Sequence, residues 1–202
     1  AFNAYEFKTA QQALYDFCND TLSSVYLAAV KDRLYCDSED SARRTQTTAT
    51  MRILSDTLSR LLAPFIPHTA DEAWRALHGD DAKSVHLQTF NSTSYACDEG
   101  WKNVMEARDV AMKALEEAKE YGLENPLDAG LVMPEQLASF NLCDLADICG
   151  VSKVSLAGDQ VTVKDLREEP RCDRSWKRDG TVKQRSDGGM LSDRDAEAVG
   201  VE

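Results

Sequence analysis

With 202 residues, 43% of them apolar and 29% charged, the chain can bury one sizeable core, or one core and a small satellite domain. No run of about 18 apolar residues occurs, so we expect no membrane span. The net charge of −12 is unusual for a free-standing nucleic-acid-binding domain. Charge acts over about a Debye length, however, and segment 167–186 has seven basic and four acidic residues, a local charge of +3.

Helical periodicity dominates the N-terminal part of the chain, where apolar residues recur three or four positions apart. The first helix is expected to have a joint near Cys18, where Asp20 or Thr21 would cap a second piece. Pro64 and Pro67 kink the chain after the second helix. The predicted helices cover residues 5–35, about 41–63, 69–77 and about 99–121, with a short strand or an extended crossing at 84–90.

Near Gly122 the pattern changes to that of a small α/β unit. Its predicted strands cover 127–133, 151–156 and 161–164, and its short helices cover 134–140 and 142–149. From Arg167 onward the apolar content collapses, so we expect a poorly ordered tail with a helical turn at 193–199. The predicted fold is mainly α, with a helical bundle at 1–121, a small α/β subdomain at 122–166 and the tail at 167–202.

The first residues lack the basic and apolar regions of a signal peptide. The chain also enters helical pattern without an initiator methionine, which we interpret as a piece of a longer protein. The cysteines are scattered, and with no export signal we expect a reducing, cytoplasmic compartment. They are Cys18, Cys36, Cys97, Cys143, Cys149 and Cys172.

Several strings follow one another in an order that carries a resemblance. They are Lys31-Asp32-Arg33-Leu34-Tyr35, Leu62-Ala63-Pro64-Phe65-Ile66-Pro67-His68-Thr69, Asp71-Glu72-Ala73-Trp74 and Ser84-Val85-His86-Leu87. Together they resemble the C-terminal anticodon-binding region of isoleucyl-tRNA synthetases, which are class I aminoacyl-tRNA synthetases. The first and last strings favour the isoleucine enzyme over its valine and leucine relatives.

The resemblance implies tRNA recognition within an isoleucine–tRNA ligase that uses ATP and Mg for aminoacylation in protein biosynthesis. Its implied partners are tRNA-Ile and the catalytic body of the parent synthetase, with no membrane and a monomeric state. The chain has no string like the family's His-Ile-Gly-His or Lys-Met-Ser-Lys-Ser. We therefore expect no catalytic residues and no cofactor here, and no activity from this piece alone.

The tail departs from the family pattern. Many bacterial members hold zinc there with two Cys-x-x-Cys pairs, through four thiolates. By resemblance the first pair falls at Cys172 and Ser175, and the second at Ser192 and Asp195. This degenerate zinc-finger-like tail is not expected to bind zinc or another metal, and Cys172 becomes a spare thiol.

Candidate RNA-binding residues flank the connector between the first two helices and occupy the basic tail. At the connector, Lys and Arg would contact phosphates while Arg and Gln would read base edges, and the alternative is a solvated face with salt bridges to Asp32, Asp37, Glu39 and Asp40. In the basic tail, Trp176 would stack on a base. The candidates are Lys31, Arg33, Arg43, Arg44 and Gln46, followed by Arg174, Trp176, Lys177 and Arg178.

Other conspicuous residues have structural interpretations. His68 starts a helix and has no nucleophile or carboxylate in a motif relation to it. Asp71 and Glu72 point in different directions on that helix and favour its N-terminus through the helix dipole. Trp74 and Trp101 are expected to anchor cores.

Two other function classes stay open. The charge of −15 outside the basic segment suits a protein–protein docking module, whose sign would be an exposed apolar stripe on the bundle. An independent hydrolase or transferase would need a catalytic motif that the sequence lacks.

Overall fold

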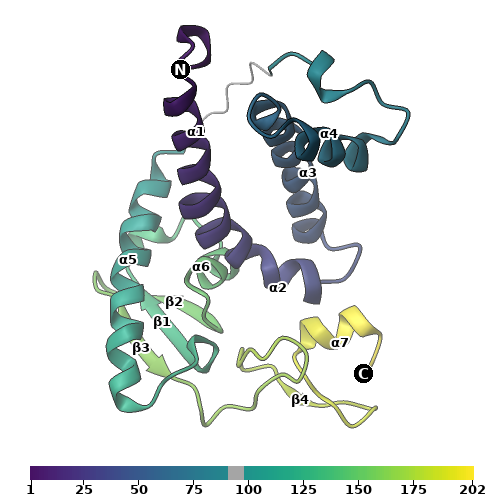
Figure 1. Cartoon of the computed structure of the whole chain (residues 1–202). Helices are drawn as coiled ribbons and strands as arrows, with labels where there is room; N and C mark the ends of the chain where they lie inside the picture. Colours follow the sequence, from purple (N-terminus) through teal and green to yellow (C-terminus); the bar gives the residue numbers. More distant parts are fainter. Residues whose placement is uncertain (91–97) are drawn as a thin grey trace. The chain divides into compact units, whose positions relative to one another are not determined.

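The computed structural model describes residues 1–90 and 98–202, which form two compact units (Figure 1). One unit comprises Ala1–Ser24 and the segment that begins at Ala42. The other comprises Val25–Ser41 and the chain from residue 98 to the end. Among the helices of these described residues, none is both long and apolar enough to cross a membrane.

The first helical run is continuous from Phe7 to Cys36. After a short turn, η1 (Phe2–Ala4), it contains α1 (Phe7–Asp16), a π-helical stretch η2 (Phe17–Leu27) and α2 (Ala28–Cys36). The predicted joint near Cys18 is therefore a widened helix and not a break with a side-chain cap. The helix therefore continues through the polar residues of this stretch without a break.

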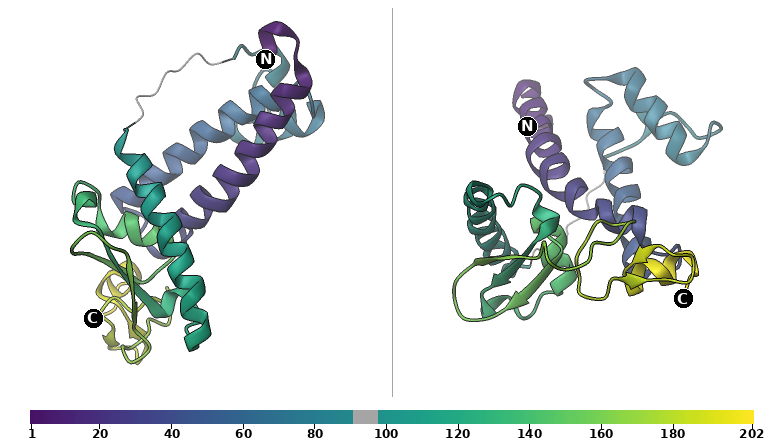
Figure 2. Two further views of the ribbon diagram at one scale, coloured as in Figure 1. Left: turned by 90° about the vertical axis from the view of Figure 1, so that its left-hand side faces the viewer. Right: turned by 90° about the horizontal axis from the view of Figure 1, so that it is seen from below.

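In the first unit, α3 (Ala42–Leu62) packs against α4 (Pro67–His78), as Figure 2 shows. Pro67 begins α4, where its missing N–H costs no helical hydrogen bond. A small core lies between the helices and the chain that follows them. Its buried members are Ala63, Ala70, Trp74 and Val85.

Segment 84–90, predicted as a short strand or an extended crossing, forms no strand and contains a single 3-10 turn, η3 (Val85–Leu87), with Gln88 extended after it. Asp71 on α4 accepts hydrogen bonds from the Ser84 hydroxyl at 2.6 Å and from the first N–H of η3 at 3.0 Å. These contacts fix the segment against α4 and occupy backbone that a strand would pair.

The second unit contains a three-stranded sheet of order β2-β1-β3. Its strands are β1 (Ala129–Met133), β2 (Lys153–Leu156) and β3 (Thr162–Asp165). β1 runs parallel to β2, with Leu131 opposite Val154, and antiparallel to β3. All three predicted strands are therefore present, and the apolar β1 is the central one.

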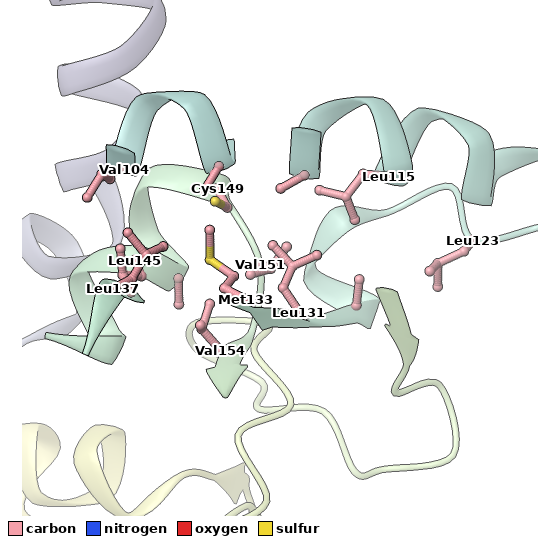
Figure 3. Packing of buried hydrophobic residues seen from close by; sticks show 14 residues of the cluster. Val104, Leu115, Leu123, Leu131, Met133, Leu137, Leu145, Cys149, Val151 and Val154 are labelled. Atoms are coloured by element: carbon pink, nitrogen blue, oxygen red, sulfur yellow. The ribbon is translucent and has the colours of Figure 1, made fainter. Parts of the chain in front are cut away.

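The main core of this unit lies between the sheet and two helices, α5 (Gly100–Ala118) and α6 (Leu142–Cys149). Figure 3 shows side chains from β1, α5 and α6 meeting there. Short turns η4 (Lys119–Tyr121), η5 (Pro126–Asp128) and η6 (Glu135–Leu137) connect these elements. Since α5 packs on β1 and β3, it belongs by contact to the α/β unit, and the boundaries expected at 121 and 166 stay predictions.

The tail is folded, so the expectation of poor order is wrong. It contains a two-stranded antiparallel hairpin, β4 (Lys183–Gln184) with β5 (Met190–Leu191), and the helix α7 (Asp193–Val199), drawn in yellow in Figures 1 and 2. Its apolar core is small, so composition predicts little order. Polar contacts to α2 and to α6 hold it instead. The buried apolar residues are Cys172, Val182, Leu191 and Ala196.

Candidate nucleic-acid interface

A predicted cation and an exposed aromatic ring lie together on α2. Lys31 and Tyr35 lie one helical turn apart and therefore project from the same face. Lys31 is exposed, and the Tyr35 ring is 72% exposed. An exposed ring beside an exposed cation suits RNA, because a splayed base stacks on the ring while the cation attracts phosphate.

Both side chains line a pocket of about 440 Å³ in the second unit. Its other walls come from residues 125–127, from the end of α6 and from the turn at 174–177. Four of the predicted RNA-binding residues therefore share one hollow, although they lie far apart in the sequence. They are Lys31, Arg174, Trp176 and Lys177.

Trp176 holds the most unusual backbone conformation at this pocket. Its φ is +64°, a left-handed value that costs a non-glycine residue about 1–2 kcal/mol. Hydrogen bonds from Trp176 N–H to the Cys172 carbonyl (3.0 Å) and from Cys172 N–H to the Lys177 carbonyl (2.9 Å) close the turn. The turn holds the indole 53% exposed, with the Arg171 guanidinium 5.5 Å from the ring centre. Such strain is typical of ligand-binding turns.

Arg174 links the turn to the end of α2. Its Nη2 donates to the carbonyl oxygens of Tyr35 (3.0 Å) and Cys36 (3.4 Å). These carbonyls belong to the last turn of the helix, which has no intrahelical donors for them. Arg174 therefore fixes the backbone beneath the Tyr35 ring, while its own side chain stays one-third exposed.

Arg33 and Lys177, by contrast, face inward. Arg33 Nη2 lies 2.7 Å from Asp144 Oδ1 and 2.8 Å from Asp147 Oδ2. Lys177 Nζ lies 2.8 Å from Asp147 Oδ1 and 3.0 Å from Asp32 Oδ2. The Asp147 side chain is 1% exposed, so these cations neutralise a buried carboxylate. The structure gives both residues a structural role, and RNA contact by either stays a prediction.

Asp32 is ionised over nearly the whole pH range. Burial raises its pKa, but a hydrogen bond from Arg194 and the charges of Lys177 and Arg194 outweigh burial and lower the pKa to about 2. Burial likewise lowers the pKa of Lys177, and the carboxylates of Asp147 and Asp32 raise it above the ordinary lysine value. Asp32 and Lys177, which both line the pocket, therefore carry opposite charges at neutral pH.

Arg178 also lies in internal contacts. Its Nε donates to Asp128 Oδ1 at 2.7 Å, its Nη1 donates to the Glu169 carbonyl, and its N–H donates to the Ser152 hydroxyl. The side chain is 14% exposed. Arg178 ties the tail to η5 and to the turn before β2, and its predicted RNA contact stays untested.

Sequence comparison identifies the family of this chain. Residues 1–130 match the family described as the anticodon-binding domain of tRNA ligase. The chain belongs to this family.

Curated relatives of this anticodon-binding domain extend the match into the tail. The chain is similar to isoleucine–tRNA ligases of Agrobacterium fabrum (32% identity over 98% of the chain), Syntrophotalea carbinolica (36% over 87%) and Brachyspira hyodysenteriae (32% over 98%). It spans about a quarter of their length, since the aligned parts cover 23%, 22% and 24% of those proteins.

The remaining RNA-binding candidates lie at the start of α3, in the other unit of the anticodon-binding domain. Arg43 and Arg44 are half-buried there, and Gln46 is exposed. Their backbone carbonyls accept hydrogen bonds from the hydroxyls of residues 47, 48 and 50. The structure thus divides the predicted cluster of five between two units, and the contacts of these three with RNA stay a prediction.

Of the two tryptophans predicted to anchor cores, one does so and the other does not. Trp74 is 4% exposed and donates from Nε1 to the Lys83 carbonyl at 2.9 Å, so it anchors a core as predicted. Trp101 is 44% exposed, and the prediction that it anchors a core is wrong. It lies in the first turn of α5, beyond the end of the core, with its ring edge-on to Phe140 at 5.5 Å.

Sequence reasoning missed Tyr35 and Arg194 as site residues. In the sequence, Tyr35 stands out only as part of the Lys31–Tyr35 string, although its place four residues after Lys31 is a usable signal. Arg194 pairs with Asp32 at 2.5 Å and with Asp37 at 3.3 Å. No local pattern points to Arg194, because both partners lie more than 150 residues earlier in the chain.

Proposed function

We propose that this chain recognises the anticodon stem-loop of tRNA-Ile as part of an isoleucine–tRNA ligase. The family match and the isoleucine–tRNA ligase relatives support the proposal. The main observation behind the proposal is the pocket in the second unit. Two exposed aromatic side chains, Tyr35 and Trp176, line it together with the cationic side chains of Lys31 and Arg174.

The mechanism that we propose is recognition without chemistry. Lys31 would contact a phosphate, and the exposed faces of Trp176 and Tyr35 would stack on bases splayed from the loop. The hydrogen-bonded turn at 172–177 would hold Trp176 in place, and the bond from Arg174 to the Tyr35 carbonyl would fix the backbone of Tyr35. Reading the anticodon adds discrimination that an apolar amino-acid pocket lacks, since one methylene changes binding there by only about 1–3 kcal/mol.

Within the parent enzyme, aminoacylation with ATP and Mg would take place outside this chain. The chain alone should therefore catalyse no isoleucine-dependent pyrophosphate exchange. We place the protein in the cytoplasm as a monomer. Exchange activity in the purified chain would contradict this division of labour.

Binding of a tRNA-Ile anticodon stem-loop tests the main proposal, with an unrelated stem-loop as competitor. Trp176→Ala should weaken binding by about 1–3 kcal/mol, roughly fivefold to 150-fold, through the lost stacking. Tyr121→Ala is the matched control, because Tyr121 is an 82% exposed ring in the same unit that does not line this pocket. Equal binding of both stem-loops, or equal losses in both variants, would refute the proposal.

A docking surface for the catalytic part of the parent is a second candidate role. Ile53, Ile66 and Leu87 in the first unit are 50%, 44% and 74% exposed. Exposed apolar side chains of this size suit a surface that another part of a protein covers. Purified catalytic part should then bind the chain in trans, and Leu87→Asp should weaken that binding. Undiminished binding by the variant would exclude this surface.

A further inference from the structure

The four tail positions that correspond to the family's zinc ligands converge on one atom, Oδ2 of Asp195. Three side chains donate hydrogen bonds to this oxygen: the Cys172 thiol at 3.0 Å, the Ser175 hydroxyl at 2.5 Å and the Ser192 hydroxyl at 3.0 Å. Cys172, Ser192 and Asp195 are each at most 1% exposed. One member of the set therefore occupies the centre, and the other three surround it.

The donor set does not fit zinc. A structural zinc site has four Cys or His ligands around an ion, with zinc–sulfur distances of about 2.3 Å. Here only Cys172 offers sulfur, and the Ser175 and Ser192 hydroxyls point their hydrogens at the carboxylate. Among the described residues, no group of three or more His, Cys, Asp or Glu side chains is placed to hold a metal ion.

The charges around the centre also oppose a cation. Oδ1 of Asp195 lies 3.0 Å from Arg194 Nη2 and 3.8 Å from Arg174 Nε. Two guanidinium groups thus compensate one buried carboxylate, where a metal site would need spare negative charge. The same two arginines reach α2: Arg194 pairs with Asp32, and Arg174 donates to the Tyr35 carbonyl.

We propose that the Asp195 carboxylate replaces the metal ion at the centre of this knuckle, so that the tail folds without zinc. In a zinc knuckle the ion ties two short segments together. Here Asp195, at the start of α7, ties its own segment to the turn that carries Cys172 and Ser175. Ser192 serves both parts, because its oxygen also accepts the Asp195 N–H at 3.2 Å as the cap of α7.

The arrangement also explains why the tail is ordered despite its small core. Domains this short usually need a metal or a disulfide in addition to their apolar core. The Asp195 centre provides an equivalent cross-connection, and it is built only from side chains of this chain. It also sets the turn that positions Trp176, so the proposal deepens the RNA-binding function but does not depend on it.

The first test uses the whole unmodified chain, expressed with zinc in the medium. We expect less than a tenth of an equivalent of zinc by elemental analysis. Hydrogen–deuterium exchange of peptides from 170–199 should not change with EDTA. Stoichiometric zinc, together with faster exchange in the tail after EDTA, would overturn the proposal.

The second test changes the centre. Asp195→Ala leaves three donors and two arginines without their acceptor, so amide exchange in 170–199 should accelerate on the order of tenfold or more, while exchange in β1 stays slow. Asp195→Asn should be intermediate, because it keeps one acceptor and loses the charge. Glu197→Ala, an exposed carboxylate on the same helix, is the matched control. Full protection in Asp195→Ala would overturn the proposal.

The third test rebuilds a metal site. The triple variant Ser175→Cys, Ser192→Cys, Asp195→Cys should bind one Co²⁺ with thiolate-to-cobalt absorption, and its tail should become sensitive to EDTA. The unmodified chain should show no such absorption. Cobalt binding by the unmodified chain with the same spectrum would contradict the replacement of the ion by Asp195.

Discussion

Replacing Lys177 with methionine asks whether this cation stabilises the fold or meets RNA. Its Nζ lies 2.8 Å from Asp147 Oδ1 and 3.0 Å from Asp32 Oδ2, and its side chain is 13% exposed. Lys177→Met keeps the apolar stem and removes the charge. Each carboxylate retains one arginine, since Asp147 pairs with Arg33 and Asp32 pairs with Arg194.

The size of the effect follows from these contacts. A hydrogen bond to a charged group contributes about 1.5–3 kcal/mol, so the loss of two sets an upper bound of roughly 6 kcal/mol. The retained arginines and the avoided burial of an ammonium group offset part of this. We therefore expect Lys177→Met to lower the free energy of unfolding by about 2–3 kcal/mol at pH 7.

Lys31→Met is the matched comparison, because Lys31 lines the same pocket and is exposed. Urea unfolding should show a change within about 0.5 kcal/mol for this variant. Stem-loop binding across a salt series should show the reverse order, with the slope of log K against log salt smaller by roughly one for Lys31→Met and unchanged for Lys177→Met. If Lys177→Met kept full stability and lost the salt slope, the assignment of Lys177 to the fold would be refuted.

Three further outcomes follow from single residues. The pKa of Asp32 is lowered in the folded chain, so its contribution is complete above about pH 4 and is lost as the pH falls towards 2. The difference in unfolding free energy between wild type and Asp32→Asn should shrink by about 2 kcal/mol between pH 5 and pH 2, and a pH-independent difference would contradict this. Burial, with smaller effects of nearby carboxylates, raises the pKa of the Cys36 thiol to about 11, so iodoacetamide at pH 8 should modify the exposed Cys143 well before Cys36. Equal rates by peptide mass spectrometry would rule out a protected Cys36. Gly150 ends α6 with a φ of +69°, so Gly150→Ala should cost about 1–2 kcal/mol in thermal unfolding and Gly150→Asn less, with equal losses arguing against backbone strain.

Local signals predicted the regular elements well. The buried face of α5 follows from spacing alone, and Val104, Ala107, Ala111 and Leu115 are all buried. The central strand β1 lies within segment 127–133, which the sequence predicts as a strand. Trp101 shows the limit of this reasoning: it continues the same stripe, but the core ends before it does. Helical periodicity identifies which face of a helix is buried, but it does not show how far along the helix the core that covers this face extends.

The candidate site was less predictable, because its members are defined by partners distant in sequence. Lys31 and Arg33 look alike on α2, yet Arg33 reaches Asp147, 114 residues away, while Lys31 stays exposed. Composition likewise suggested a loose tail. Composition cannot predict that a buried carboxylate such as Asp195 accepts several hydrogen bonds, because its donors come together only in the folded chain.

The last turn of α2 depends on a residue that the chain reaches late. Arg174, 139 residues after Tyr35, donates hydrogen bonds to the terminal carbonyls of this helix. Contacts of such long sequence separation form slowly, because a large loop must close first. We therefore expect the positions of Tyr35 and Trp176 to form after the β1–β2 core. A nascent or truncated chain that lacks its final segment would then have a frayed end of α2 and an incomplete RNA-binding pocket.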